Sequence, residues 1–148
     1  MQEPSPQRIQ ALFITHPRSH LHLQNHYDVT LVDNTYSTNR FGMYLMVTIG
    51  IDNCGNSFFI SFAFLSDQTE ESYKWALSCN KELFANLNTP IVIMGPEAIA
   101  TDCDQALRNA ISKVFPDSPA FLCAWHANKN IQQHCSLCFL LRKTGKIF

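Results

Sequence analysis

A change of hydrophobic period near the middle of the chain constrains its fold more than any other feature. Before residue 66, apolar residues form three runs of strand length, at 28–33, 43–51 and 57–65. These runs are rich in β-branched and aromatic residues, and the stretches between them, 34–39 and 52–56, have turn-like composition. Beyond residue 67, apolar residues recur every three or four positions, which is typical of amphipathic helices. The chain therefore predicts three consecutive antiparallel strands followed by helices that alternate with strands.

The second half of the chain divides at prolines and turn residues. We expect a first helix over about 70–87, with Asp67 and Glu70 spaced as in a capping box, and a second over about 106–115. A fourth strand comes from one or both of 91–94 and 98–101, a fifth strand is 120–123, and 125–141 has helical character. The stretch 11–14 fits either a strand or a short helix, and we expect Trp75 and Trp125 in the core. The predicted class is α/β, a mixed five-stranded sheet with flanking helices.

The length of 148 residues suits one domain. We expect 1–10 to be a flexible leader and 11–148 to form the folded domain. No apolar run approaches the ~20 residues that a membrane-spanning helix requires, so we expect no membrane partner. The formal net charge is −1, whereas surfaces that grip nucleic acid are usually basic. If DNA is the partner, the segment alone binds it poorly or through a local basic patch, and no DNA-binding residue is assigned.

Two aspartates stand where predicted strands end. Asp33 ends the first strand and Asp102 ends the fourth. The order of elements is similar to that of the ribonuclease-H-like fold, in which these two strands are parallel neighbours. Their ends would meet at one edge of the sheet, where open α/β sheets place their sites. Two close carboxylates repel each other, and a hard divalent cation such as Mg²⁺ or Mn²⁺ relieves that repulsion. The alternative is that each aspartate is a turn former or a helix cap, with Asp102 or Asp104 capping the second helix.

Four ordered blocks resemble the Mutator-like element (MULE) transposase domain, a DDE-type, ribonuclease-H-like family. The first runs from Asp33 to Met43 and resembles a D-x-T-Y-x-T-N block. The second includes Glu71, Ser72, Tyr73 and Trp75, and the third begins Thr101-Asp102-Cys103-Asp104-Gln105-Ala106-Leu107. The fourth, Cys123 to His126, is similar to a C-x2-H signature. With the similar lead-in at 12–17, the resemblance covers residues 11–131.

The resemblance implies a metal-dependent enzyme that cuts and joins DNA with three acids. Asp33 and Asp102 would be the first two acids and would bind Mg²⁺ or Mn²⁺ in a two-metal site, with Cys123 and His126 associated with that site. Its partners would be transposon ends and target DNA in the nucleus, with self-association in a full-length transposase. The third acid is a glutamate beyond the C-x2-H block, and no residue here is assigned to it. We therefore expect 11–148 to be a partial, C-terminally truncated catalytic core of this family that is inactive alone. Ser37 and Tyr44 depart from the family's usual Lys and Pro.

Cysteine and histidine spacing raises the question of zinc. Cys123-x2-His126 and Cys135-x2-Cys138 both have spacings found in structural zinc modules. No Gly or Pro lies between His126 and Cys135, so a continuous helix would hold them about 13 Å apart. One tetrahedral ion cannot span that distance, so we expect no shared zinc.

Two other functions fit parts of this pattern. The far-red-impaired family of plant transcriptional regulators resembles the same domain, so a domesticated, DNA-binding and non-catalytic protein is the main alternative. A ribonuclease-H-like nuclease is a further one, but it needs more acids near the site. Asp28 and Asp67 are poorly placed for that role.

Overall fold

The computed structural model describes residues 8–35, 39–89, 92–124 and 126–128. Within them nine elements follow one another, most within two residues of the bounds that the hydrophobic pattern predicts. They are β1 (Ala11–Thr15), α1 (Pro17–Leu23), β2 (Val29–Thr35), β3 (Tyr44–Ile51), β4 (Ser57–Leu65), α2 (Glu70–Ala85), β5 (Ala98–Thr101), α3 (Gln105–Val114) and β6 (Ala120–Leu122). Residues 1–7 of the predicted leader lie outside the described residues, and so does the predicted helix over 125–141 except for residues 126–128.

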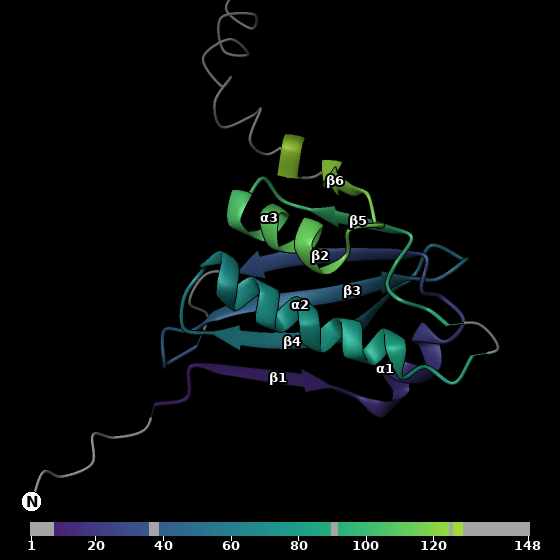
Figure 1. Cartoon of the computed structure of the whole chain (residues 1–148), viewed down its shortest axis with the longest axis horizontal. Coiled ribbons are helices and arrows are strands. Elements are labelled where there is room, and N and C mark those ends of the chain that lie inside the picture. The colour runs from purple at the N-terminus through teal and green to yellow at the C-terminus, as the bar shows by residue number, and fades with distance from the viewer. Residues whose placement is uncertain (1–7, 36–38, 90–91, 125, 129–148) are drawn as a thin grey trace, which may run out of the picture.

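The strands form one mixed sheet in the order β1-β4-β3-β2-β5-β6 (Figure 1). β1, β4, β3 and β2 pair antiparallel, whereas β2 pairs with β5, and β5 with β6, in parallel. The prediction of five strands was one short, because the ambiguous stretch near residue 11 adds a strand at the edge, with Phe13 opposite Ala63. The three antiparallel strands and the parallel addition of the later strands are confirmed.

The turn between β3 and β4 illustrates how local chemistry sets the strand pairing. Asp52 accepts hydrogen bonds from the backbone N–H groups of Cys54 and Asn56 at 2.9 and 2.7 Å. Gly55 has a φ of 82°, a conformation that glycine adopts without a Cβ clash. The turn therefore brings Ile51 opposite Ser57 and starts the β3–β4 ladder.

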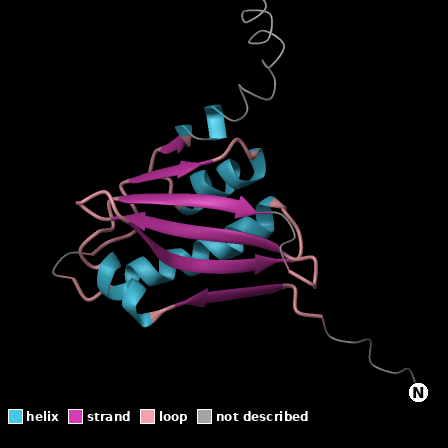
Figure 2. Ribbon diagram, turned by 180° about the vertical axis from the view of Figure 1, so that it is seen from behind, coloured by secondary structure: helices cyan, strands magenta, loops and turns pink. Residues whose placement is uncertain are grey.

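The helices α2 and α3 lie side by side on one face of the sheet (Figure 1). Seen from behind, the strands lie in front of these helices (Figure 2). The core fills the space between sheet and helices and includes Val32, Met46, Ala63, Leu65, Tyr73, Leu77, Phe84, Ile99 and Ile111. We call the face of the sheet on which α2 and α3 pack the covered face, and the opposite face of the sheet the open face.

Two local predictions need correction, and one open alternative is settled. The N-cap of α2 is Thr69, whose hydroxyl accepts from the N–H of Ser72, so Asp67 does not cap the helix directly. Of the two candidate segments for the fourth strand, only 98–101 forms one, and the described residues 92–94 do not. Trp75 is 40% exposed rather than in the core, and Trp125 lies outside the described residues. Among the described helices, none has the length and apolarity needed to cross a bilayer.

Candidate functional site

Asp33 lies inside β2, close to its end. The predicted strand ended at Asp33, but β2 continues to Thr35, which pairs with Leu45 of β3. Exposure alternates along the strand, with Val32 and Asn34 buried and Asp33 between them partly exposed. Because successive side chains of a strand point to opposite faces, Asp33 belongs to the open face.

Asp102 directly follows the neighbouring strand, β5, at the position equivalent to Asp33. The parallel ladder between β2 and β5 ends with Val32 opposite Thr101. Asp33 and Asp102 are each one residue further on, and neighbouring strands lie about 4.8 Å apart. Thr101 is buried on the covered face and is the last residue of β5, so Asp102 begins the loop directly after that strand.

Asp102 does not cap α3, which was the alternative to a functional role for this residue. Asp104 is the N-cap of α3 and accepts a 2.8 Å hydrogen bond from the N–H of Leu107. Asp102 instead accepts the N–H of Asp104 on Oδ1, at 3.1 Å. This bond orients the Asp102 carboxylate and occupies one lone pair of one oxygen.

The C-x2-H block meets the first aspartate. Nε2 of His126 lies 3.4 Å from Oδ1 of Asp33, and the two side chains are 23% and 39% exposed. Cys123 is partly exposed with a free thiol, and its backbone N–H donates to the carbonyl of Thr101 at 2.7 Å. These contacts bring segments of the first, third and fourth sequence blocks together at the carboxyl ends of β2 and β5. Cys135 and Cys138 lie outside the described residues.

The donor set at these strand ends suits a hard cation in part. Two carboxylates from adjacent parallel strands provide the oxygen ligands that Mg²⁺ and Mn²⁺ prefer. Within the described ranges, no group of three or more His, Cys, Asp or Glu side chains is arranged to hold a metal ion. The residues therefore fit one side of a metal site, with water or another ligand completing the coordination.

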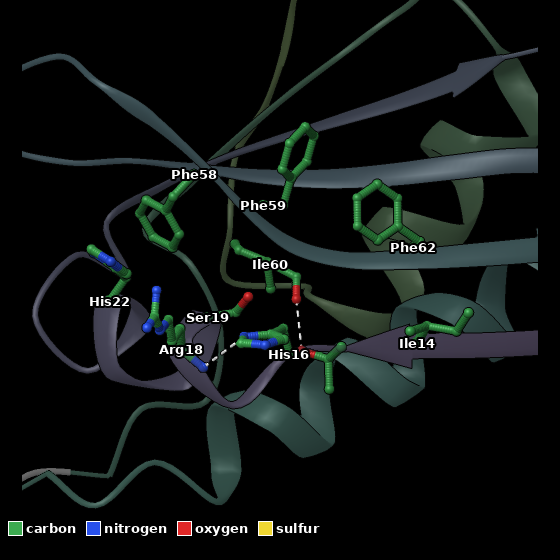
Figure 3. Close-up of a pocket in the computed structure, with 10 residues that line it drawn as sticks. Ile14, His16, Arg18, Ser19, His22, Phe58, Phe59, Ile60 and Phe62 are labelled. Carbon is green, nitrogen blue, oxygen red and sulfur yellow. Dashed lines mark hydrogen bonds between the residues drawn. The ribbon is translucent and has the colours of Figure 1, made fainter.

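A separate pocket of about 470 Å³ lies near the β1 end of the strand order, between β1, β4 and α1. Its wall is aromatic, with Phe58, Phe59 and Phe62, and Arg18 stands at its rim (Figure 3). Sheet pairing relates it to the aspartates: Asp33 is opposite Val47, and Val47 is opposite Phe62. The pocket is thus two strands away from Asp33, and none of the four predicted site residues lines it.

The fold and these strand ends together define an α/β domain with paired aspartates at the ends of adjacent parallel strands. The MULE transposase domain family matches residues 29–130, which include β2 to β6 and all four predicted site residues. The chain belongs to this family, as its sequence blocks indicated.

Similar proteins come from plants and a fungus. FAR1-RELATED SEQUENCE 5 and FAR-RED IMPAIRED RESPONSE 1 of Arabidopsis thaliana are 28% and 25% identical over 95% and 88% of this chain. The PKS-NRPS hybrid synthetase cheA of Chaetomium globosum is 35% identical over 72% of it. The chain spans only 17%, 15% and 2% of the lengths of these three relatives. The similarity therefore does not by itself assign the activities of those whole proteins to this segment.

Proposed function

We propose that this chain is a catalytic-core segment of a cut-and-paste DNA transposase with a ribonuclease-H-like fold, acting on DNA in the nucleus. Asp33 and Asp102 are two of its three acids and together bind Mg²⁺ or Mn²⁺. The observation that carries the proposal is their equivalent placement, one residue beyond the last pair of the β2–β5 parallel ladder. Membership of the MULE transposase domain family supports it independently.

Each residue of the site has a distinct task in this proposal. Bound divalent cations activate the attacking oxygen and stabilise the leaving oxygen of phosphoryl transfer. Asp33 and Asp102 would bind the cations through their carboxylates at the ends of β2 and β5. The N–H of Asp104 fixes the orientation of the Asp102 carboxylate. His126, 3.4 Å from Asp33, restrains the Asp33 carboxylate from the side of β6. A complete centre needs a third acid, which we assign to no residue of this segment.

Calorimetric titration with Mn²⁺ tests the site directly. We expect weak binding by the unmodified chain and none by Asp33→Asn or Asp102→Asn, because an amide lacks the negative charge that attracts the cation. Asp28→Asn is the matched control, since Asp28 is exposed and precedes the opposite end of β2. Both site variants should unfold at the same temperature as the control. No binding by the unmodified chain, or equal binding in all variants, would refute the metal site.

A second candidate is a domesticated, non-catalytic regulator of the far-red-impaired type. The similarity to FAR1-RELATED SEQUENCE 5 over 95% of this chain favours it. The two candidates predict different results in a longer protein containing this segment. A transposase nicks DNA carrying its terminal repeats when Mn²⁺ is present, and Asp33→Asn abolishes nicking. A regulator binds its DNA without nicking, and Asp33→Asn leaves its affinity unchanged.

A further inference from the structure

The backbone ladder between β2 and β5 stops just before the two aspartates. Its last pair is Val32 with Thr101. Beyond it, Asp33 still pairs with Val47 of β3, whereas the carbonyl of Thr101 accepts the N–H of Cys123. Within the described residues, the β2–β5 ladder therefore does not join Asp33 to Asp102, although a shared cation requires a fixed separation between the two carboxylates.

Tyr73 of α2 bridges this gap from the covered face. Its hydroxyl accepts a 2.6 Å hydrogen bond from Nδ2 of Asn34, the residue after Asp33. The same hydroxyl lies 3.4 Å from Oδ2 of Asp104, to which it can donate its proton. The Tyr73 side chain is fully buried, so water does not compete for these bonds. A single hydroxyl thus links the two segments that carry the aspartates.

Asp104 passes this restraint on to Asp102 and to α3. Its Oδ1 caps the helix by accepting the N–H of Leu107, which leaves Oδ2 for Tyr73. Its own N–H donates to Oδ1 of Asp102 at 3.1 Å. Any shift of Asp104 therefore moves the donor that orients the Asp102 carboxylate.

The tyrosine keeps the proton that this arrangement needs. Burial, the charge of Asp104 and, to a lesser degree, that of Asp102 raise the pKa of Tyr73 well above its ordinary value. The hydroxyl is consequently protonated at neutral pH and can donate a hydrogen bond. A phenolate here would instead repel the Asp104 carboxylate.

We propose that Tyr73 is a positioning residue for the metal site, holding Asp33 and Asp102 at the separation that a shared cation requires, through Asn34 on one side and Asp104 on the other. This inference rests on the proposed function, because it presumes that the two aspartates bind a cation. Groups behind metal ligands commonly change metal affinity by about 10–100-fold when they are removed.

Tyr73→Phe separates this role from core packing, because it keeps the buried ring and removes only the hydroxyl. Its matched control is Tyr27→Phe, a partly buried tyrosine just before the start of β2, at the other end of that strand from Asp33. We expect the dissociation constant for Mn²⁺ to rise about tenfold in Tyr73→Phe and to stay unchanged in Tyr27→Phe. Circular dichroism confirms that both variants are folded at the titration temperature.

Asp104→Ser provides a second, independent variant. Serine is as good an N-cap as aspartate, so α3 keeps its cap, but the side chain is too short to reach Tyr73. We expect the same weakening of Mn²⁺ binding, and the double variant Tyr73→Phe/Asp104→Ser should be no weaker than either single one. Additive losses would mean that the two residues act separately and would overturn the linkage.

A measurement without metal completes the test. Loss of the Tyr73 hydroxyl should speed hydrogen exchange at the backbone N–H of Asp104, while Tyr27→Phe leaves that rate unchanged. Unchanged Mn²⁺ affinity in folded Tyr73→Phe overturns the positioning role and leaves the proposed function intact. Absence of Mn²⁺ binding in the unmodified chain overturns the proposed function and, with it, this inference.

Discussion

The covered and open faces of the sheet differ in what their residues do. Strand residues of the covered face, such as Met46, Ala63 and Leu65, are fully buried against α2 and α3. The open face carries Asp33 and, from the β1 edge inwards, exposed apolar residues such as Leu12, Ile14 and Phe59. The same strands supply both faces, because side chains alternate along each strand.

Residues that stabilise the fold and a residue proposed to bind metal are therefore only one position apart in the chain. Asp33 lies between Val32, which packs in the core, and Asn34, which bonds to Tyr73. A substitution on the covered face should therefore change the free energy of unfolding, whereas one on the open face should change mainly what binds there. The predictions below test how complete that separation is.

The largest expected effect is on a buried aromatic pair of the covered face. Phe84 of α2 is 1% exposed, and its ring lies 6.1 Å from that of Phe115 in an edge-to-face arrangement. Phe84→Ala should lower the free energy of unfolding by about 3–5 kcal/mol, measured by urea denaturation. Phe59→Ala on the open face, where the ring is 57% exposed, should cost less than about 1 kcal/mol. Equal losses in the two variants would show that the open face is also part of a packed core.

A smaller effect is expected from the polar group that joins α2 to the middle of the sheet. Asn80 is buried, accepts a 2.7 Å hydrogen bond from Ser61 and donates one of 3.1 Å to Thr48. Asn80→Ala leaves both hydroxyls without this partner and should cost about 1–3 kcal/mol. Asn53→Ala, in the exposed turn before β4, is the control and should stay within about 0.5 kcal/mol of the unmodified chain. A loss below 0.5 kcal/mol for Asn80→Ala would mean that packing alone holds α2 in place.

The covered face was also the easier one to predict from sequence. Its apolar residues set the periods that indicated β2 to β4, α2 and α3, and the turn residues marked their ends. The edge strand β1 stayed ambiguous, because four apolar residues fit either a strand or a helix until the partner strand is known. The end of β2 was placed two residues early, because Asn34 and Thr35 have turn-like composition and the partner of Asn34, Tyr73, is distant in sequence.

For the candidate site, the sequence pointed to both aspartates, whose role stays a prediction, but not to what surrounds them. The family blocks carried Asp33, Asp102, Cys123 and His126, and the order of elements predicted the parallel neighbours that carry the two acids. The 3.4 Å contact between His126 and Asp33 spans most of the chain and leaves no local signal. Tyr73 lay within a matched block, yet helical spacing marked it only as a core residue.

The next effect concerns how α2 begins, since this helix covers much of the sheet. Thr69 accepts the N–H of Ser72 at the N-cap. Thr69→Ala removes that acceptor and should lower the free energy of unfolding by about 1 kcal/mol, whereas Thr69→Ser keeps it and should change little. Urea denaturation of both variants measures the difference. Similar values for the two would mean that the loop before α2 sets the start of the helix without the cap.

The smallest effect is a pH dependence at the same helix start. Hydrogen bonds from Ser72 and Thr69 hold the pKa of Asp67 below its ordinary value. A carboxylate whose pKa is lower in the folded state stabilises the fold above its unfolded pKa of about 3.9, and this contribution is lost as pH falls through the folded value. Urea denaturation from pH 6 to pH 3 should therefore show a stability difference between the unmodified chain and Asp67→Asn that is constant at the upper end and shrinks in acid.

The Thr69→Ala variant tests the cause of this pH dependence. Asp67 accepts hydrogen bonds from both the N–H and the hydroxyl of Thr69, at 3.1 and 2.7 Å, and from the Ser72 hydroxyl at 2.6 Å. Removing the Thr69 hydroxyl leaves three donors, the third being the Ser66 hydroxyl at 3.4 Å from Oδ2, so the acid-sensitive difference should become smaller without disappearing. If the difference is the same with and without that hydroxyl, its donated bond does not lower the pKa of Asp67. The helix start on the covered face would then depend on pH through the remaining donors alone.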